Sequence, residues 1–110
     1  MQRDREYLLD IIEGAKAAHS YVKGKTKQDF LKDFQCQDAV VRRLEIIGEA
    51  ARRVSEQTRE SLTDLPWTEM ISMRNILIHR YDDIDMLIIW DTVHNDIPPL
   101  IAALEKTIRS

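Results

Sequence analysis

One short segment of this 110-residue chain carries an unusual set of polar side chains. It covers positions 73–81 and has the sequence MRNILIHRY. Among apolar neighbours it places two cations, an amide, an imidazole and a phenol: Arg74, Arg80, Asn75, His79 and Tyr81. The buried face of a helix does not need such groups, whereas a site that handles phosphate could use them. The segment is therefore the candidate functional site of the chain.

Three of these side chains could together cleave RNA. Arg74 supplies a permanent planar cation that can clamp a phosphate or its transition state. His79 belongs to the residue type that titrates near neutral pH and can move a proton, and Asn75 can orient the histidine or the phosphate. These groups suffice for a reaction in which the ribose 2′-hydroxyl attacks the adjacent phosphorus. Such a site requires no metal ion and no cofactor.

The spacing of the segment predicts that one copy cannot gather these groups. On an ideal helix, residues five apart point about 140° away from each other, so Arg74 and His79 do not share a face. Asn75 and His79 are four apart and do share one, while Arg74 and Tyr81 would align if the helix continued past His79. Two copies facing each other across a two-fold axis would collect the polar groups in one cleft. This favours a composite site in a homodimer.

Spacing alone also permits an explanation without any site. An arginine and a histidine five positions apart occur in many helical proteins. His79 could be a polar residue of the last helical turn, where a cation favours the helix dipole. Tyr81 could be a core aromatic residue with its hydroxyl at the edge. On the residues alone, the choice between a structural and a functional role stays open.

The elements that must position this segment are helices in a single domain over residues 1–110. Glycine and proline are scarce, at three each, which favours an all-α chain. Apolar periodicity predicts an up-and-down bundle of four main helices and a short one: residues 3–21, a short helix through Phe30, Leu31 and Phe34, then 35–57, 66–79 and 86 onwards. The prolines at 98–99 predict a kink or short break near Asn95–Asp96.

The third helix carries two features that concern the candidate site. Its apolar residues step by three or four along one stripe: Cys36, Val40, Leu44, Ile47, Ala51 and Val54. Gly48 lowers helix stability, so it predicts a close approach by another helix or backbone. Glu49 could contact Arg74, but we expect an exposed helix face with an i,i+4 ion pair to Arg53.

The charges allow only local contact with RNA. Arg42, Arg43, Arg52 and Arg53 on the third helix could extend a surface for RNA. Glutamates are interleaved with them, so we expect a solvated face with ion pairs. The net charge of −3 excludes a global field that attracts nucleic acid, although an oligomer could pool two local patches.

Composition predicts a cytoplasmic protein that does not contact a membrane. The one cysteine, Cys36, excludes an intramolecular disulfide and a multi-cysteine zinc site. The first residues show no apolar signal region. The longest apolar run, from Met86 to Trp90, is too short to span a bilayer.

The segment RNILIHRY at 74–81 resembles the R-x4-H-x-Y motif of the HepT-like toxins, which belong to the HEPN superfamily of helical domains. The resemblance continues on both sides of the motif. LEIIGEAA at 44–51 is similar to the third-helix segment of the family, and LPW at 65–67 with MRN at 73–75 is similar to the start of its motif helix. Asp85, IWD at 89–91 and NDIPPL at 95–100 resemble its C-terminal helix. The similarity covers nearly the whole chain, in order.

The resemblance implies a fold and an activity. Members of the family are dimeric α-helical bundles whose motif helices meet at the dimer interface, and many HEPN proteins are metal-independent ribonucleases. In that role Arg74 would stabilise the pentacoordinate phosphate, and His79 would act as general acid or base. Asn75 would position both groups. The implied protein is an endoribonuclease toxin that acts on RNA as a homodimer.

The resemblance also implies a partner. HepT-like toxins are typically encoded with a minimal nucleotidyltransferase antitoxin. That partner is understood to transfer AMP onto the motif tyrosine, here Tyr81. The adenylate would place negative charge and bulk beside Arg74 and His79, and would keep RNA out of the cleft.

Two other functions stay open from the sequence. The chain could be a non-catalytic dimeric scaffold that binds the nucleotidyltransferase, with Tyr81 as the substrate of that enzyme. It could also be a nucleotide-binding module that holds a phosphate at Arg74 without cleaving it. The complete set of Arg74, Asn75 and His79 favours the ribonuclease, because a pure scaffold does not require it.

Overall fold

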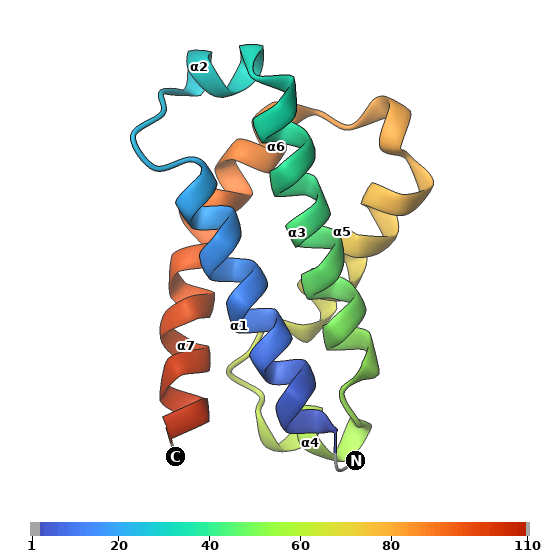
Figure 1. The fold of residues 1–110 in the computed structure, drawn as a ribbon. Helices are drawn as coiled ribbons and strands as arrows, with labels where there is room; N and C mark the ends of the chain where they lie inside the picture. The colour runs from blue at the N-terminus through green and yellow to red at the C-terminus, as the bar shows by residue number, and fades with distance from the viewer. Residues whose placement is uncertain (1–2, 110) are drawn as a thin grey trace.

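Four long helices make up most of the computed structural model, which describes residues 3–109, with the backbone alone at Tyr81. They are α1 (Asp4–Tyr21), α3 (Phe34–Arg53), α5 (Trp67–His79) and α7 (Ile97–Arg109). Three short helices lie between them: α2 (Lys27–Lys32), α4 (Glu56–Ser61) and α6 (Met86–Asp91). Successive long helices run in alternating directions (Figure 1), and residues 3–109 contain no strand. The predicted all-α architecture with four main helices is confirmed.

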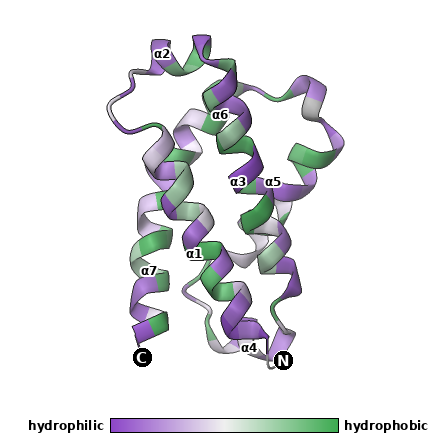
Figure 2. Ribbon diagram, in the orientation of Figure 1, coloured by the Kyte–Doolittle hydropathy of each residue, from purple (hydrophilic) through white to green (hydrophobic). Residues whose placement is uncertain are grey.

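The core of the bundle is built around α3. This helix packs against α1 on one side and against α5 on the other, and α7 packs against α1. Polar and apolar residues alternate along α1, α3 and α7 (Figure 2), and every residue of the predicted apolar stripe of α3 is at most 8% exposed. The position of α5, which carries the motif, is therefore set through its packing against α3.

No helix in the described range is long and apolar enough to cross a membrane.

Several helix ends follow from the capping residues that the sequence shows. Thr26 and Asp29 form a capping box at the start of α2, with reciprocal hydrogen bonds of 3.0 and 3.2 Å. Asp85 caps α6 and accepts a hydrogen bond from the N–H of Leu87 at 2.9 Å. Phe34 was expected in the short helix but is the first residue of α3, because the residue before it caps that helix. Local side-chain chemistry thus fixes the connections at the α2 end of the bundle.

The third helix ends earlier than its apolar period predicts. We expected it to cover residues 35–57, but α3 ends at Arg53 and Val54 is extended. Ser55 then caps the separate helix α4 through the N–H of Thr58 at 3.2 Å. A serine hydroxyl competes for backbone groups and favours a cap over a helix interior. The apolar stripe therefore continues to Val54, although the helix does not.

The prolines of the last helix do not break it. Near Asn95–Asp96, where a kink or short break was predicted, the chain makes a π-helical turn over Thr92–Asp96, in which the N–H of Ile97 donates to the carbonyl of Thr92. A proline has no N–H and crowds the turn that precedes it, and a widened turn relieves this crowding. Pro98 and Pro99 then lie in the first turn of α7. The π turn joins α6 to α7 without a gap in the helical chain.

A buried carboxylate joins the start of α1 to α4. Asp4 is 9% exposed and accepts hydrogen bonds from the N–H and hydroxyl of Ser55, at 3.0 and 2.6 Å, and from the hydroxyl of Thr58. These bonds, with those from Ser55 the largest cause, hold the pKa of Asp4 below its ordinary value. The charged form of Asp4 is therefore favoured by folding.

The Asp4→Asn variant should be less stable than the wild type at neutral pH by about 1–2 kcal/mol, because the buried donors lose a charged acceptor. Since the folded pKa is depressed, this contribution is present above the unfolded pKa of about 4 and is lost as the pH falls through the folded pKa. Urea unfolding between pH 2 and pH 7 measures it. The matched control is Asp38→Asn, at an exposed aspartate of α3. If the free energy of unfolding depended on pH equally in both variants, Asp4 would not be the carboxylate that folding favours in its charged form.

Gly48 allows α5 to lie directly against α3, as the sequence predicts. A Cβ atom at this position would overlap the Cβ of Arg74 and lie 2.6 Å from the carbonyl oxygen of Met70. Both neighbours belong to α5, and one of them is backbone, so neither can move without moving the helix. The close approach of the two helices thus depends on a missing side chain beside Arg74.

We expect Gly48→Ala to lower the free energy of unfolding by about 2 kcal/mol, because overpacking outweighs the better helix propensity of alanine. Chemical denaturation measures this change. Gly14→Ala is the control, since its Cβ would meet mainly the side-chain Cγ1 of Ile47 at 3.0 Å, which can shift. Equal effects of the two substitutions would show that the α3–α5 contact is not the constraint.

Candidate functional site

Arg74 is held in a fixed orientation between α5 and α3. Its side chain is 22% exposed, its Nη2 atom lies 3.0 Å from Glu49 Oε1, and its Nη1 atom donates to Asn75 Oδ1 at 2.9 Å. Arg74 Nε and Glu49 Oε1 have no hydrogen-bond partner among the described residues, so the contact with Glu49 is a close ion pair rather than a bidentate hydrogen bond. Contacts on two nitrogens of a planar group fix its plane.

Glu49 faces three arginines at once. Its Oε2 atom accepts hydrogen bonds from Arg53 at 2.8 Å and from Arg52 at 3.1 Å, while its Oε1 atom faces Arg74. Hydrogen bonds from Arg52 and Arg53 are the main reason that the pKa of Glu49 lies below its ordinary value. The predicted pair with Arg53 is confirmed. The expectation of a simply exposed face is wrong, because Glu49 is half-buried and reaches α5.

Asn75 and His79 are exposed on α5, whereas Arg74 is directed at α3. The chain is α-helical from Trp67 to His79, so residues five apart keep the expected separation of about 140°. One protomer therefore brings Arg74 and Asn75 together and leaves His79 on a different face. The separation of Arg74 from His79 follows the prediction from helix geometry, whereas the contact between Arg74 and Asn75 was not predicted.

Tyr81 begins a new element instead of extending α5. The helix ends at His79, and the backbone of Tyr81 starts the 3-10 turn Tyr81–Asp83. The helix that the predicted alignment of Arg74 with Tyr81 requires therefore does not continue as far as Tyr81. The side chain of Tyr81 lies outside the part of the chain that the structure describes, so its role stays a prediction.

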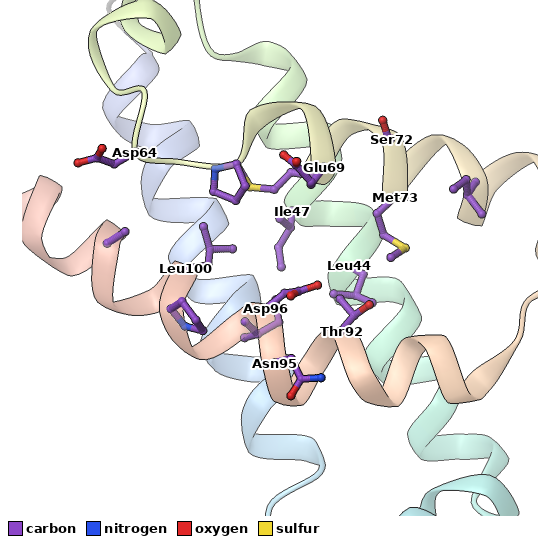
Figure 3. Close-up of a pocket in the computed structure, with 16 residues that line it drawn as sticks. Leu44, Ile47, Asp64, Glu69, Ser72, Met73, Thr92, Asn95, Asp96 and Leu100 are labelled. Atoms are coloured by element: carbon purple, nitrogen blue, oxygen red, sulfur yellow. The ribbon is translucent and has the colours of Figure 1, made fainter.

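Two hollows lie on different faces of α5. A groove of about 550 Å³ between α1, α3 and α5 is lined by Arg74 and Glu49 among others. A cavity of about 600 Å³ lies between α3, α5 and the stretch from Thr92 to Ala103 (Figure 3). Its walls are mainly apolar, and none of the candidate catalytic residues lines it. The larger hollow thus holds none of the three candidate catalytic side chains, and the groove, which Arg74 lines, is the better candidate for the chemistry.

Other residues with reactive side chains have structural surroundings. Cys36 is 8% exposed, and burial raises the pKa of its thiol. The exposed ring of His94 stacks on Trp90 with ring centroids 3.9 Å apart, and His19 is exposed at the end of α1. Across residues 3–109, no group of three or more His, Cys, Asp or Glu side chains is placed to hold a metal ion.

Comparison with known proteins places the whole motif region within one family. Residues 11–107 match the family model described as "Ribonuclease HepT-like". The "Probable ribonuclease HepT" of Thermococcus cleftensis is 39% identical over 102 residues, which cover 93% of this chain and 93% of that protein. The "Putative RNase MJ1380" of Methanocaldococcus jannaschii is 38% identical over 101 residues, which cover 92% of this chain and 93% of that protein.

A further relative is a longer protein. The "Gamma-glutamylcyclotransferase and putative RNase MJ0434" of Methanocaldococcus jannaschii is 42% identical over 101 residues. The matched part covers 91% of this chain and 46% of that protein, so the chain spans about half of that relative. No solved structure matches the chain. The family match includes α3, α5 and the complete motif at 74–81, and the chain belongs to the HepT-like ribonuclease family.

Proposed function

We propose that this protein is a metal-independent endoribonuclease that acts as a homodimer and serves as the toxin of a toxin–antitoxin pair. The observation that carries the proposal is the orientation of Arg74, whose guanidinium is held by Glu49 and Asn75 at the edge of a groove. A cation fixed in advance stabilises developing phosphate charge without reorganisation during the reaction. The names of the relatives, which include ribonuclease, support the same activity.

The proposed reaction needs three side chains. His79 accepts the proton of the ribose 2′-hydroxyl, whose oxygen attacks the adjacent phosphorus. Arg74 stabilises the pentacoordinate phosphate, and Asn75 keeps the guanidinium in place. His79 then returns the proton to the departing 5′-oxygen. One P–O bond forms and one breaks, which leaves a 2′,3′-cyclic phosphate and a 5′-hydroxyl.

A homodimer supplies the geometry that one protomer lacks. In one chain, Arg74 and His79 lie on different faces of α5, so a second copy must bring its own histidine to the arginine. The exposed face of α5 also carries Ile76 and Ile78, next to Asn75 and His79. Large apolar side chains exposed beside polar ones are typical of a surface that another protein covers. These residues support a two-fold contact through α5.

Control of the activity would act through Tyr81. We place AMP transfer by a minimal nucleotidyltransferase antitoxin on its phenol oxygen. Tyr81 follows His79 by two residues, directly after the end of α5. An adenylate there would bring a negative phosphate close to the cation that the reaction needs.

The direct test is cleavage of labelled single-stranded RNA by the purified protein in excess EDTA. Mass spectrometry first verifies that Tyr81 carries no adenylate. We expect products with 2′,3′-cyclic phosphate ends, and no cleavage where a 2′-deoxy nucleotide replaces the attacking ribose. An unmodified protein that cleaves no RNA, yet still binds the nucleotidyltransferase, would contradict the proposal and leave the non-catalytic scaffold.

Glu49→Gln should slow RNA cleavage by about tenfold, because a neutral amide holds the Arg74 guanidinium less firmly than a carboxylate does. Stability should change by less than about 1 kcal/mol, since the ion pairs of Glu49 are partly exposed to solvent. Single-turnover cleavage and urea unfolding measure the two effects. Glu56→Gln on α4 is the control. A Glu49→Gln enzyme with unchanged cleavage would mean that Arg74 is positioned without Glu49.

A further inference from the structure

The groove beside Arg74 contains more binding groups than the cleavage step uses. Arg42 and Arg53 line it from α3. Tyr7 lines it from α1, and Arg3 lines it from the position just before that helix. The side chains of the three arginines are exposed, while Tyr7 is half-buried. The groove thus presents cations to solvent around a partly fixed aromatic ring.

Tyr7 lies between two arginines. The guanidinium carbon of Arg3 is 5.9 Å from the centroid of the Tyr7 ring. Arg53 lines the same groove as Tyr7, and the pKa of Arg53 is raised chiefly by its hydrogen bond with Glu49 and then by Tyr7. Arg53 is also bonded to the carboxylate that faces Arg74. A path of adjacent groups therefore leads from the Tyr7 ring to the proposed catalytic cation.

The charge of the groove differs from that of the chain as a whole. Four arginines and three carboxylates line it: Arg3, Arg42, Arg53, Arg74, Asp10, Glu45 and Glu49. The chain carries a net charge of −3. The ion pairs of Arg3, Arg42 and Arg53 are exposed to solvent. Because exposed ion pairs contribute little stability, a phosphate can replace their carboxylates at a low cost in free energy. The carboxylates limit favourable phosphate contacts to the positions beside the arginines.

We infer that this groove is a subsite for single-stranded RNA, in which a base stacks on Tyr7 and a phosphate lies beside Arg53. Aromatic rings flanked by arginines bind unpaired bases by stacking and the adjoining phosphates by charge. A duplex keeps its bases stacked inside and cannot offer one to Tyr7. The inference rests on the proposed ribonuclease function and specifies its substrate class as unpaired RNA.

Binding to a 2′-O-methyl RNA decamer tests the stacking contact, because this RNA has no free hydroxyl for cleavage. Fluorescence anisotropy should show that Tyr7→Leu weakens binding by about tenfold, whereas Tyr7→Phe, which keeps the ring, changes it by less than about twofold. The leucine keeps much of the apolar volume that packs against the core, and circular dichroism verifies the fold. A duplex of the same sequence should bind more weakly, and Tyr7→Leu should not affect its binding.

Salt dependence tests the phosphate contact. Arg53→Ala should lower the slope of log K against log salt by about 0.7, the value for one contact with single-stranded nucleic acid. Arg5→Ala, at an exposed arginine of α1 that does not line the groove, should leave the slope unchanged. With cleavable RNA, Arg53→Ala should raise KM and largely keep kcat. A loss of kcat alone would mean that Arg53 acts through Glu49 and not on the substrate.

The outcomes separate this inference from the function on which it rests. A wild-type protein that cleaves RNA, with Tyr7→Leu and Arg53→Ala binding the decamer as tightly as the wild type, would overturn the subsite and leave the ribonuclease. Equal weakening by Tyr7→Leu and Tyr7→Phe would overturn the stacking contact. A wild-type protein that neither binds the decamer nor cleaves RNA would overturn both proposals.

Discussion

Arg74→Ala is expected to reduce the rate of RNA cleavage by about a thousandfold, since a preorganised cation at the transition state contributes on that scale. His79→Ala should cost about a hundredfold or more, because it removes the group that moves the proton. Single-turnover rates with saturating RNA measure both losses. The homodimer should persist in both variants, as size-exclusion chromatography with light scattering would show.

The loss must be specific to the motif. Arg5→Ala removes an exposed arginine from α1 and should cleave RNA at the wild-type rate. Arg74→Lys is informative too, since it keeps the charge but not the planar fork that contacts Glu49 and Asn75. We expect it to remain far below the wild-type rate. Full cleavage by Arg74→Ala or His79→Ala would show that the site assignment is wrong.

Tyr81→Phe should make the protein resistant to silencing by the proposed nucleotidyltransferase partner. Co-expression with that partner should add adenylate mass to the wild type and abolish its cleavage, because we expect the added phosphate and bulk to block the site proposed for Arg74 and His79. Phenylalanine has no oxygen to accept AMP, so Tyr81→Phe should stay unmodified and active. Intact-mass spectrometry and RNA cleavage on the same samples measure both effects.

Tyr21→Phe is the matched control for this experiment. Tyr21 is half-buried and its hydroxyl accepts a hydrogen bond from Arg43 at 3.1 Å, so it is a tyrosine with a structural contact. We expect this variant to gain adenylate and lose activity like the wild type. Adenylate on Tyr81→Phe, or silencing of that variant without any added mass, would show that the partner acts through another residue.

The helices that carry the motif could be predicted because their signals are local. The apolar period of α3 and α5 and the helix-destabilising effect of Gly48 each depend on residues within a few turns of one another. The end of α3 could not be predicted from its apolar stripe. There a single serine, Ser55, decided between continuing one helix and starting another, and the buried Asp4 accepts its hydrogen bonds from 51 residues away.

The surroundings of Arg74 depended on tertiary packing. The sequence allowed a contact between Glu49 and Arg74 but favoured an exposed face, because the spacing of one helix cannot show which residues of another helix lie opposite. Tyr7 gave no sequence signal, since it becomes notable only when α1 brings it to the same groove as Arg53. The separation of Arg74 and His79 was predictable, because it follows from helix geometry alone.

The most direct test of the composite site is complementation between two inactive variants. Differently tagged Arg74→Ala and His79→Ala chains can be co-expressed and the mixed dimer isolated through both tags. If each site takes its arginine from one protomer and its histidine from the other, the mixed dimer has one intact site and should cleave RNA at about half the wild-type rate. A mixed dimer as inactive as its two parents would contradict a site shared across the two-fold axis.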